Sequence, residues 1–252
     1  MTDRTILIGL PAYNEEIAIG RVLEKIQRLA AQLDGPVRVA VYDDGSVDGT
    51  AGIARAWQDR LDITLLGEAV NRGLGVGLLR LVEHAATTGS AHDLFVLMDC
   101  DDTHHPDQIR EMIREVEAGA DIVIASRFRK GATVKGVPFH RRLLTLGAIL
   151  LFKTIYPLRG VNDYTCGYRC YRISLLQRAW TELGPSLVRN AGFSCMVELL
   201  LKLALYRPRI KEIPLALRYD LKPTASKMAV GNNMRRLLTL LVLWKVRGIR
   251  NC

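Results

Sequence analysis

The sequence lacks the cysteine patterns that hold zinc or a disulfide framework. Its 252 residues include five cysteines, scattered along the chain, with no Cys-x-x-Cys pair. Zinc ligands come in closely spaced pairs and secreted scaffolds use even numbers of cysteine, so neither class is expected. The N-terminal segment leads into a strand-like run at 5–10, which is unlike a signal peptide. Reduced thiols and a cytoplasmic location are therefore expected.

Long apolar runs and two common nucleotide motifs are also missing. The longest apolar stretch is about ten residues, 143–152, whereas a membrane-spanning helix needs roughly 20. No Gly-x-x-x-x-Gly-Lys-Ser/Thr sequence occurs, which excludes P-loop chemistry. The glycines of 71–77 follow the third expected strand with Gly-x-Gly-x-Gly spacing, which excludes a dinucleotide fingerprint. A loop close to a phosphate stays open for this segment.

Acidic residues are scarce in the second half of the chain. Residues 1–126 contain 11 Lys and Arg against 21 Asp and Glu, whereas residues 127–252 contain 24 against 5. An acidic half can hold a metal ion, and a basic half attracts phosphates, nucleic acid or a lipid surface. An unevenly charged, solvated surface is the simpler alternative.

The order of expected elements predicts the fold class. Apolar runs predict strands, and helical spacing of apolar residues predicts helices. We expect strands at 4–10, 37–42, 62–66, 93–99 and 121–126, and helices at 15–33, 50–60, 73–88 and 106–118. This alternation predicts an α/β fold with a mainly parallel, doubly wound sheet flanked by helices.

The second half of the chain is less regular. We expect a loop at 127–140, helices at 141–156 and 193–206, a strand at 209–219 and a basic amphipathic helix at about 229–248. No repeat or low-complexity linker interrupts the chain. We therefore divide it into one catalytic domain, 1–228, and a C-terminal amphipathic helix, 229–252.

Acidic side chains end two of the expected strands. Asp43 and Asp44 follow one strand, and Asp99 and Asp101 follow another. Unpaired carboxylates are costly to bury, and ligands of parallel sheets bind beyond the carboxyl ends of the strands. On an extended segment Asp-x-Asp aims both carboxylates to one side. Such oxygen ligands suit Mg²⁺ or Mn²⁺ shared with substrate phosphates, so we predict a metal site at Asp99 and Asp101.

The alternatives at these strand ends are structural. Asp48 is expected to cap the following helix, and Asp102 and His105 are expected to belong to a surface turn before helix 106–118. A transition-metal site using His104 and His105 is disfavoured, because adjacent imidazoles rarely converge on one ion. Asp43 and Asp44 can instead accept hydrogen bonds from a nucleobase or ribose.

Taken together, the motifs resemble a known family. They are Pro-x-Tyr-Asn-Glu at 11–15, Asp-Asp-Gly-Ser-x-Asp-Gly-Thr at 43–50, Asn-x-Gly-Leu-Gly at 71–75, Met-Asp-x-Asp at 98–101 with His-x-Pro at 104–106, and Ser-Arg-Phe at 126–128. In this order they are similar to family 2 glycosyltransferases with the GT-A (Rossmann-like) fold. Within that family the chain resembles dolichyl-phosphate mannose synthases and related polyprenyl-phosphate sugar transferases over roughly residues 5–228.

The resemblance implies an inverting, metal-dependent transfer of mannose or a similar hexose. The donor would be a GDP- or UDP-linked sugar and the acceptor a polyprenyl or dolichyl phosphate. Residues implied around the donor nucleotide are Pro11, Tyr13, Glu15, Asp43, Asp44 and Cys100. Asp99 and Asp101 would hold Mg²⁺ or Mn²⁺ against the diphosphate, and Arg127, Arg218 and Lys227 would approach the donor phosphates.

Three positions depart from the pattern of the family. Thr103 stands where a Gln is usual, Cys166 stands where a Ser is usual, and the spacing from Arg218 to Lys227 is long. The first departure leaves open whether Thr103 or water completes the metal shell. The last puts the role of Arg218 in doubt.

The acceptor is inferred from charge. A hydroxyl acceptor needs a general base, whereas a phosphate is largely ionised near neutral pH because its second pKa is ~6. Glu198 is the candidate base after residue 127, and an i,i+4 pair with Lys202 is its alternative role. The scarcity of acids favours a phosphate acceptor, with plausible contacts at Arg141, Arg142, Arg169 and Arg172. A hydroxyl group on a saccharide, lipid or small molecule stays the alternative acceptor.

The basic tail suggests where the protein works. Residues 232–252 mix Arg and Lys with Leu, Val and Trp, which is typical of a helix lying on an anionic membrane surface. We expect a peripheral contact with the cytoplasmic membrane face. The alternative is packing on the domain or on a second copy, which would make a homo-oligomer. A nucleic-acid binder is a third hypothesis, motivated by a pI near 9.5, but the acidic first half argues against it.

Overall fold

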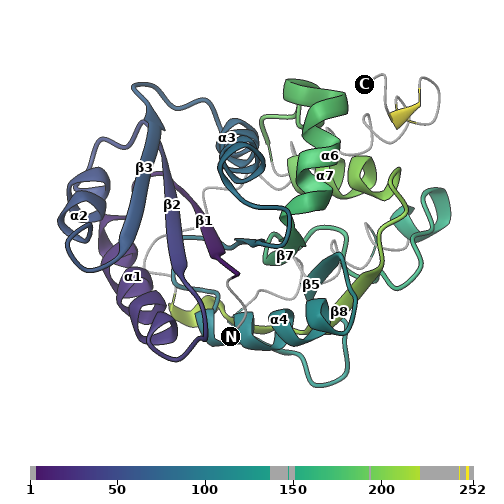
Figure 1. Ribbon diagram of the computed structural model, residues 1–252, viewed down its shortest axis with the longest axis horizontal. Coiled ribbons are helices and arrows are strands. Elements are labelled where there is room, and N and C mark those ends of the chain that lie inside the picture. The colour runs from purple at the N-terminus through teal and green to yellow at the C-terminus, as the bar shows by residue number, and fades with distance from the viewer. Residues whose placement is uncertain are drawn as a thin grey trace.

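A seven-stranded sheet forms the centre of the computed structural model, which describes residues 4–136, 147, 151–192, 194–221, 244 and 248–249 (Figure 1). The strands lie in the order β3-β2-β1-β4-β7-β5-β8. β7 is antiparallel to both of its neighbours, and the other neighbouring pairs are parallel. The bounds are β1 Ile6–Ala12, β2 Val37–Asp44, β3 Asp62–Glu68, β4 Leu94–Leu97, β5 Ile122–Ser126, β7 Arg169–Arg172 and β8 Ile210–Pro214.

Helices cover both faces of this sheet. The helices α3 (Leu74–Thr88), α6 (Ile173–Leu183) and α7 (Cys195–Ala204) pack together on one face, which is the upper one in Figure 1. On the other face lie α1 (Glu16–Ala30) and α4 (Ile109–Glu117), with the short helix α2 (Thr50–Ala56) packed against β2, β3 and α1. Three short 3₁₀ helices complete the described set: η1 Pro106–Gln108, η2 Gly184–Leu187 and η3 Tyr219–Leu221.

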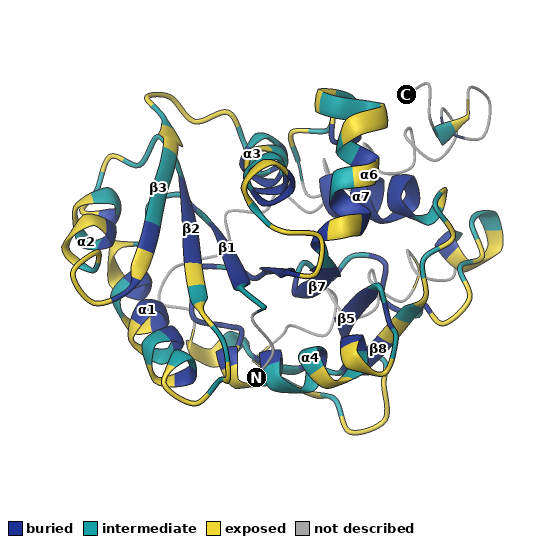
Figure 2. Cartoon of the chain, in the orientation of Figure 1, coloured by how far each residue is buried: buried dark blue, intermediate teal, exposed yellow. Residues whose placement is uncertain are grey.

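The core lies between the sheet and the two helix layers. Every residue of β4 and β5 is buried, as Figure 2 shows by the dark centre and the exposed outer turns. Strands covered on both faces read as continuous apolar runs, which is why these two strands were predictable. Packing is close enough that a Cβ atom on Gly9 would lie 2.6 Å from the Phe95 ring.

The predicted fold class is confirmed, and the differences concern single elements. β4 ends at Leu97, two residues before the predicted end. The predicted strand 209–219 is split by Leu215 into β8 and β9 (Ala216–Arg218), and β9 pairs with β6 (Thr133–Lys135) inside the predicted loop 127–140. β7 and α6 were not predicted.

Two predicted helices of the second half, 141–156 and 229–248, lie largely outside the described residues. Residues 147 and 151–155 are helical, in agreement with part of the predicted helix 141–156. Of the predicted C-terminal segment 229–252, the structure describes 244, 248 and 249, and Trp244 is buried. The division at residue 228 therefore stays a prediction. Within the described residues, no helix combines the length and the apolar character needed to cross a bilayer.

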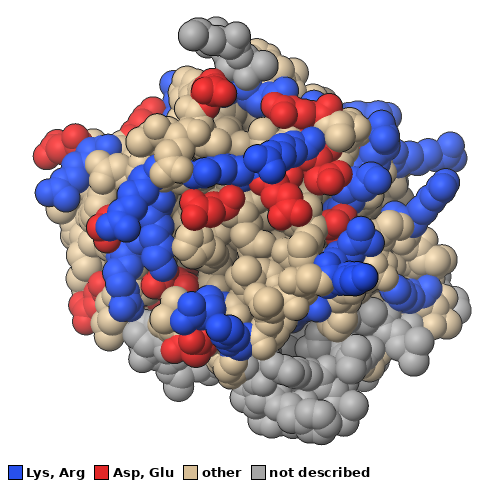
Figure 3. Space-filling model, turned by 90° about the horizontal axis from the view of Figure 1, so that it is seen from below, with Lys and Arg blue, Asp and Glu red and all other residues tan. Residues whose placement is uncertain are grey.

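Charges of both signs alternate on the face that carries α1 and α4 (Figure 3). Lysine and arginine side chains lie beside acidic ones, as in the pairs that Lys25 and Arg21 make with Asp102. A polyanion such as nucleic acid is attracted by a surface of predominantly positive charge. This face therefore gives no support to the nucleic-acid hypothesis.

Candidate active site

The loops that follow β1 and β2 hold each other at the carboxyl edge of the sheet. The backbone N–H of Asn14 donates to Ser46 Oγ at 2.9 Å, and Asn14 Oδ1 accepts from the N–H of Val47 at 2.9 Å. The N–H of Glu15 donates to Thr50 Oγ1 at 2.8 Å. These bonds bring the two predicted walls of the nucleotide site, 11–15 and 43–50, side by side.

Asp43 and Asp44 have different environments, although they are adjacent in the sequence. Asp44 is buried and accepts hydrogen bonds from the N–H groups of Arg72 and Gly73 at 2.7 and 2.8 Å. It therefore fixes the turn before α3. Asp43 is partly exposed, and its Oδ1 accepts from the N–H of Ser46 at 3.1 Å. Of the pair, Asp43 is the one whose carboxylate is accessible to a ligand.

The other side chains predicted around the nucleotide lie on this edge too. Pro11, Tyr13 and Glu15 are half-buried beside the loop that follows β2. Cys100 packs in the hydrophobic core with 2% of its surface exposed. Its side chain therefore faces away from solvent, and a contact between Cys100 and a nucleotide would use its backbone.

The acidic loop after β4 contains carboxylates of two kinds. The side chain of Asp99 is 40% exposed, whereas Asp101 is 7% exposed and accepts from Thr103 N and Oγ1 at 3.2 and 2.6 Å. Because β4 ends at Leu97, both lie in the loop, and the expected alternation of an extended strand does not set their directions. Thr103 has a definite role, which is to orient Asp101.

The neighbouring acidic and histidine residues do structural work. Asp102 has a φ of 64° and pairs with Lys25 and Arg21 on α1. The prediction of a surface turn that caps the next helix is wrong for Asp102, because this carboxylate is 4% exposed and its partners are on α1. His105 caps η1 by accepting from the N–H of Asp107 at 3.4 Å, as expected of a helix start.

His104 supports the loop in a way that the sequence did not reveal. Its Nδ1 accepts from the N–H of Asp99 at 3.2 Å, so the neutral ring carries its proton on Nε2. Nε2 lies 3.9 Å from Asp99 Oδ2, and the ring stacks on Tyr168 with centroids 4.8 Å apart. His104 therefore constrains the backbone of Asp99, and its ring lies beside the Asp99 carboxylate.

Arg127, which is partly exposed, forms an ion pair with the fully buried Asp163 beside this loop. Arg127 donates to Asp163 from its backbone N, Nε and Nη2 at 3.1, 2.8 and 2.6 Å, and also from Nη2 to Thr165 Oγ1 at 2.6 Å. Burial alone would raise the pKa of Asp163, but the guanidinium of Arg127 holds it below its ordinary value. Burial alone would lower the pKa of Arg127, and Asp163 and Asp99 raise it above its ordinary value.

The segment that contains Asp163 is held by hydrogen bonds to Glu212 and passes close to Asp99. Glu212 on β8 accepts from the N–H of Asn162 and of Asp163. A Cβ atom on Gly167 would lie 3.7 Å from Asp99 Oδ1 and 3.3 Å from Met196 Cε. The 163–168 backbone therefore passes within van der Waals reach of the Asp99 side chain.

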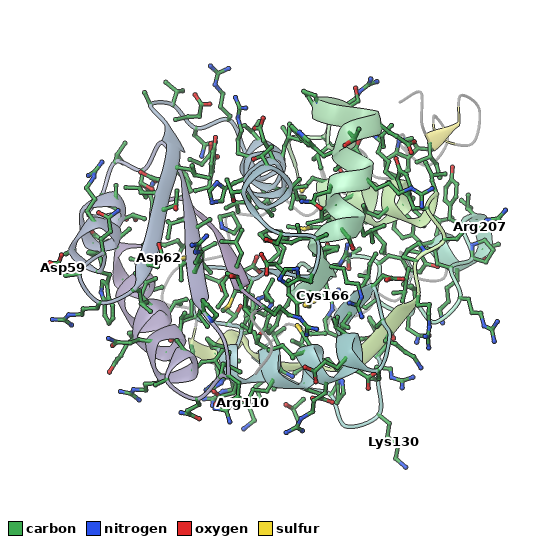
Figure 4. All side chains as sticks on the ribbon, in the orientation of Figure 1. Asp59, Asp62, Arg110, Lys130, Cys166 and Arg207 are labelled. Atoms are coloured by element: carbon green, nitrogen blue, oxygen red, sulfur yellow. The ribbon has the colours of Figure 1, made fainter. Side chains whose placement is uncertain are left out.

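Cys166 lies on the same segment, near the middle of the molecule, whereas Asp59, Arg110, Lys130 and Arg207 lie toward its rim (Figure 4). It is a free, buried cysteine. Burial raises the pKa of its thiol to about 12. The thiol is therefore protonated near neutral pH and is not a nucleophile.

The strand β9 contacts the acidic loop through backbone hydrogen bonds. The N–H of Arg218 donates to the carbonyl of Thr103 at 3.0 Å, and Leu217 pairs with His104. The Arg218 side chain forms an exposed pair with Asp220 at 2.9 Å, so its predicted contact with a phosphate stays a prediction. Lys227, Arg141 and Arg142 lie outside the described residues.

Three other charged residues singled out in the sequence make contacts inside the protein. Glu198 has no exposed surface and pairs with Lys202 at 2.6 Å, which is the i,i+4 arrangement. Arg169 is fully buried and donates to the carbonyls of Met196 and Tyr164. Arg172 donates to the carbonyls of Ala120 and Val116 around the end of α4. These contacts favour structural roles over a base or a phosphate contact.

The described residues contain no group of three or more His, Cys, Asp or Glu side chains arranged to hold a metal ion. Asp99 and Asp101 supply two carboxylates from one loop. Such a pair fits Mg²⁺ or Mn²⁺ when phosphate oxygens and water complete the coordination, which is the usual arrangement for Mg²⁺.

The mainly parallel sheet, with acidic loops at its carboxyl edge, has the arrangement expected of the GT-A fold. The family model described as glycosyl transferase family 2 matches residues 7–183, and the chain belongs to this family. The sequence is 28% identical over 249 residues to polyprenol monophosphomannose synthase of Mycolicibacterium smegmatis, covering 98% of this chain and 89% of that protein. It is 33% identical over 240 residues to dolichyl-phosphate hexose transferase of Haloferax volcanii, covering 92% of each.

A solved structure with the same fold is glucosyl-3-phosphoglycerate synthase from Mycobacterium tuberculosis in complex with Mn²⁺, UDP and glucosyl-3-phosphoglycerate. The TM-score is 0.68 at 24% identity, and the match covers 95% of this chain and 79% of that one. At this identity the likeness concerns the fold. The predicted GT-A fold and the predicted family are therefore both confirmed.

Proposed function

We propose that this glycosyltransferase moves a hexose from a nucleotide-diphosphate sugar to a polyprenyl phosphate, with Mg²⁺ or Mn²⁺. The observation that carries the proposal is the match over more than nine-tenths of the chain to two enzymes named for polyprenol or dolichyl phosphate and a hexose. The Mn²⁺ and UDP bound by the structural neighbour support a divalent cation and a nucleotide donor.

The donor would lie across the loops that follow β1, β2 and β4. Asp43, Tyr13, Glu15 and Pro11 would surround the base and ribose, and Asp99 and Asp101 would hold the cation against the diphosphate. The cation supplies positive charge where the leaving diphosphate becomes more negative. Arg127, 24% exposed, adds a second positive charge that Asp163 keeps fixed, and a fixed charge needs no reorganisation during the reaction.

The fate of the acids in the second half supports a phosphate acceptor. Asp163, Glu198 and Glu212 are buried and accept hydrogen bonds from neighbouring groups, and Asp220 pairs with Arg218. Four of the five acids after residue 127 are thus committed to contacts within the protein. A hydroxyl acceptor needs a general base, and these contacts leave the four carboxylates poorly placed to act as one, whereas an ionised phosphate attacks without a base.

The acceptor would come from a membrane, and the basic tail is the part proposed to touch it. A peripheral contact at the cytoplasmic face requires cationic and apolar side chains on one helix, which the composition of 229–252 provides. A homo-oligomer through this tail is the other arrangement. The relative affinities for GDP and UDP distinguish the two donor nucleotides.

The proposal is tested by nucleotide binding with and without Mn²⁺. Isothermal titration of GDP and of UDP should show that Mn²⁺ strengthens binding of one of them to the wild-type protein. Asp99→Asn should weaken Mn²⁺-dependent binding by about a hundredfold, since it removes a charge at an ion–diphosphate contact. Asp107→Asn, an exposed acid eight residues away in the chain, is the control and should bind as the wild type does. Equal Mn²⁺-dependent affinity of Asp99→Asn and wild type would contradict the proposal.

A further inference from the structure

The glycine-rich segment 71–77 forms a surface on which another part of the backbone packs. The N–H of Gly75, in the first turn of α3, donates to the carbonyl of Ala191 at 2.9 Å. A free helix N-terminus is where an anion would bind, but here a backbone carbonyl occupies the Gly75 donor. A Cβ atom on Gly75 would lie 1.7 Å from the Asn190 carbonyl oxygen, and one on Gly73 would lie 2.8 Å from that of Ala191. The glycines therefore let the 190–191 backbone lie directly on the start of α3.

The segment 189–191, which packs on these glycines, is held in place by hydrogen bonds to Glu198. One oxygen of its carboxylate, Oε2, accepts from the N–H of Arg189, the N–H of Asn190 and Asn190 Nδ2 at 3.0, 2.9 and 2.6 Å. Lys202 donates to the other oxygen, Oε1, and to the carbonyl of Ser186, both at 2.6 Å. Glu198 and Lys202 have no exposed surface, so their pairing is protected from water.

The turn formed by Arg72 and Gly73, just before α3, also contacts the end of β2. Asp44, next to Asp43, accepts from the N–H groups of Arg72 and Gly73. The turn Arg72–Gly73 is therefore fixed between Asp44 and the 190–191 backbone. Two parts of the chain more than a hundred residues apart meet here, one from each half of the molecule.

We infer that Glu198 is a positioning residue for the donor nucleotide. Through the 189–191 backbone it holds the start of α3, and through the Arg72–Gly73 turn it holds Asp44 and the end of β2, where Asp43 meets the nucleotide. This inference rests on the proposed function, because it assigns the nucleotide to the loop that follows β2. It differs from a general-base role, because Glu198 then acts through contacts with backbone rather than through a proton.

Two double variants separate the acceptor oxygen of Glu198 from its charge. E198Q/K202M removes both buried charges but keeps an amide oxygen for the N–H groups of Arg189 and Asn190. E198L/K202M removes the acceptor as well. In both, the unpaired buried charge that a single substitution would leave is avoided. Asp93→Asn is the matched control: Asp93 is a buried carboxylate that accepts from the N–H of Thr5 and of Ser90, at the amino end of β4.

The measurement is isothermal titration of GDP and of UDP, each with Mn²⁺, on folded protein checked by circular dichroism. We expect E198Q/K202M and Asp93→Asn to stay within about twofold of the wild-type Kd, and E198L/K202M to bind about tenfold more weakly. In the transfer assay E198L/K202M should raise the donor KM with little change in kcat, whereas loss of a base would lower kcat. Hydrogen exchange at the N–H of Gly75 should be faster in E198L/K202M alone.

A second pair of variants tests the contact between Gly75 and the 190–191 backbone without changing Glu198. Gly75→Ala places a methyl group where the Asn190 carbonyl lies and should weaken nucleotide binding as E198L/K202M does. Gly52→Ala, in α2, meets nothing within 4 Å and should leave binding unchanged. Wild-type affinity in E198L/K202M and in Gly75→Ala would overturn the inference, as would equal weakening in E198Q/K202M. If wild-type protein binds neither GDP nor UDP, the proposed function fails first and the inference fails with it.

Discussion

Asp163 joins more of the candidate site than any other single carboxylate described above. It accepts from Arg127, from Thr165 and from the N–H of Cys166, and its own N–H is held by Glu212. Its negative charge is stable in the interior because the guanidinium of Arg127 compensates it. Removal of one partner of a buried pair leaves the other uncompensated, which is costly.

Asp163→Asn should therefore lower the free energy of unfolding at pH 7 by about 3 kcal/mol. The pKa of Asp163 is lowered in the folded protein from an ordinary value of 3.8, so its stabilising contribution is complete above that value and is lost as the pH falls below it. The wild-type protein should lose this stability as the pH falls below about 4, and Asp163→Asn should lose less over the same range.

Urea unfolding at several pH values measures both effects. Asp220→Asn is the matched control, because Asp220 also pairs with an arginine but lies on the surface; it should change stability little. Equal acid sensitivity of Asp163→Asn and the wild type would show that the carboxylate is not what the fold relies on.

The residues of the site were predicted as groups but not as individuals. Motif spacing brought Asp43, Asp99 and Asp101 to one edge of the sheet. It did not distinguish Asp43 from Asp44, whose partners lie 28 and 29 residues away. It also did not reveal His104 as the support of Asp99. These roles depend on contacts that form after the chain has folded, and no local pattern encodes them.

At the scale of elements, Gly9 on β1 leaves room for the side chain of Phe95 on β4. A Cβ atom there would lie 2.6 Å from the ring of Phe95 and 3.6 Å from Leu81 on α3. The absence of a side chain at this position lets Phe95 fill the space between the sheet and α3. Position 52 in α2 has the opposite character, because its surroundings are open.

Gly9→Ala should destabilise the protein by about 2 kcal/mol, because the added methyl group overpacks the core. Gly52→Ala should stabilise it by about 1 kcal/mol, because alanine is the better helix former and meets no neighbour. Chemical denaturation of the two variants beside the wild type gives both values. Stabilisation by Gly9→Ala would mean that the strands are less closely packed than described.

β7 and α6 were missed for different physical reasons. β7 contains Arg169 and Arg172, so its four residues do not read as an apolar strand, yet Arg169 is buried by donating to two carbonyls. α6 follows β7 directly, without the turn residues that usually separate a strand from a helix. The first five strands were predictable because their apolar runs are continuous or nearly so.

At the scale of the whole molecule, the two halves of the sequence meet at one edge of the sheet. The first half brings Asp43, Asp99 and Asp101 to this edge, and the second half brings Arg127. The uneven distribution of charge along the chain thus corresponds to an acidic loop from the first half that lies within electrostatic reach of Arg127 from the second half. Most acids of the second half are used within the fold, which supports an acceptor that is already charged.

The most direct test of this account is the structure of the transferred product. Purified protein is incubated with Mn²⁺, a labelled GDP- or UDP-hexose, and a mixture of a polyprenyl phosphate and the corresponding polyprenol. We predict that the label enters the lipid as a sugar joined through phosphate, which mild acid releases. Label joined to the polyprenol hydroxyl in an acid-resistant linkage, or transfer that is unchanged in Asp99→Asn, would contradict the account.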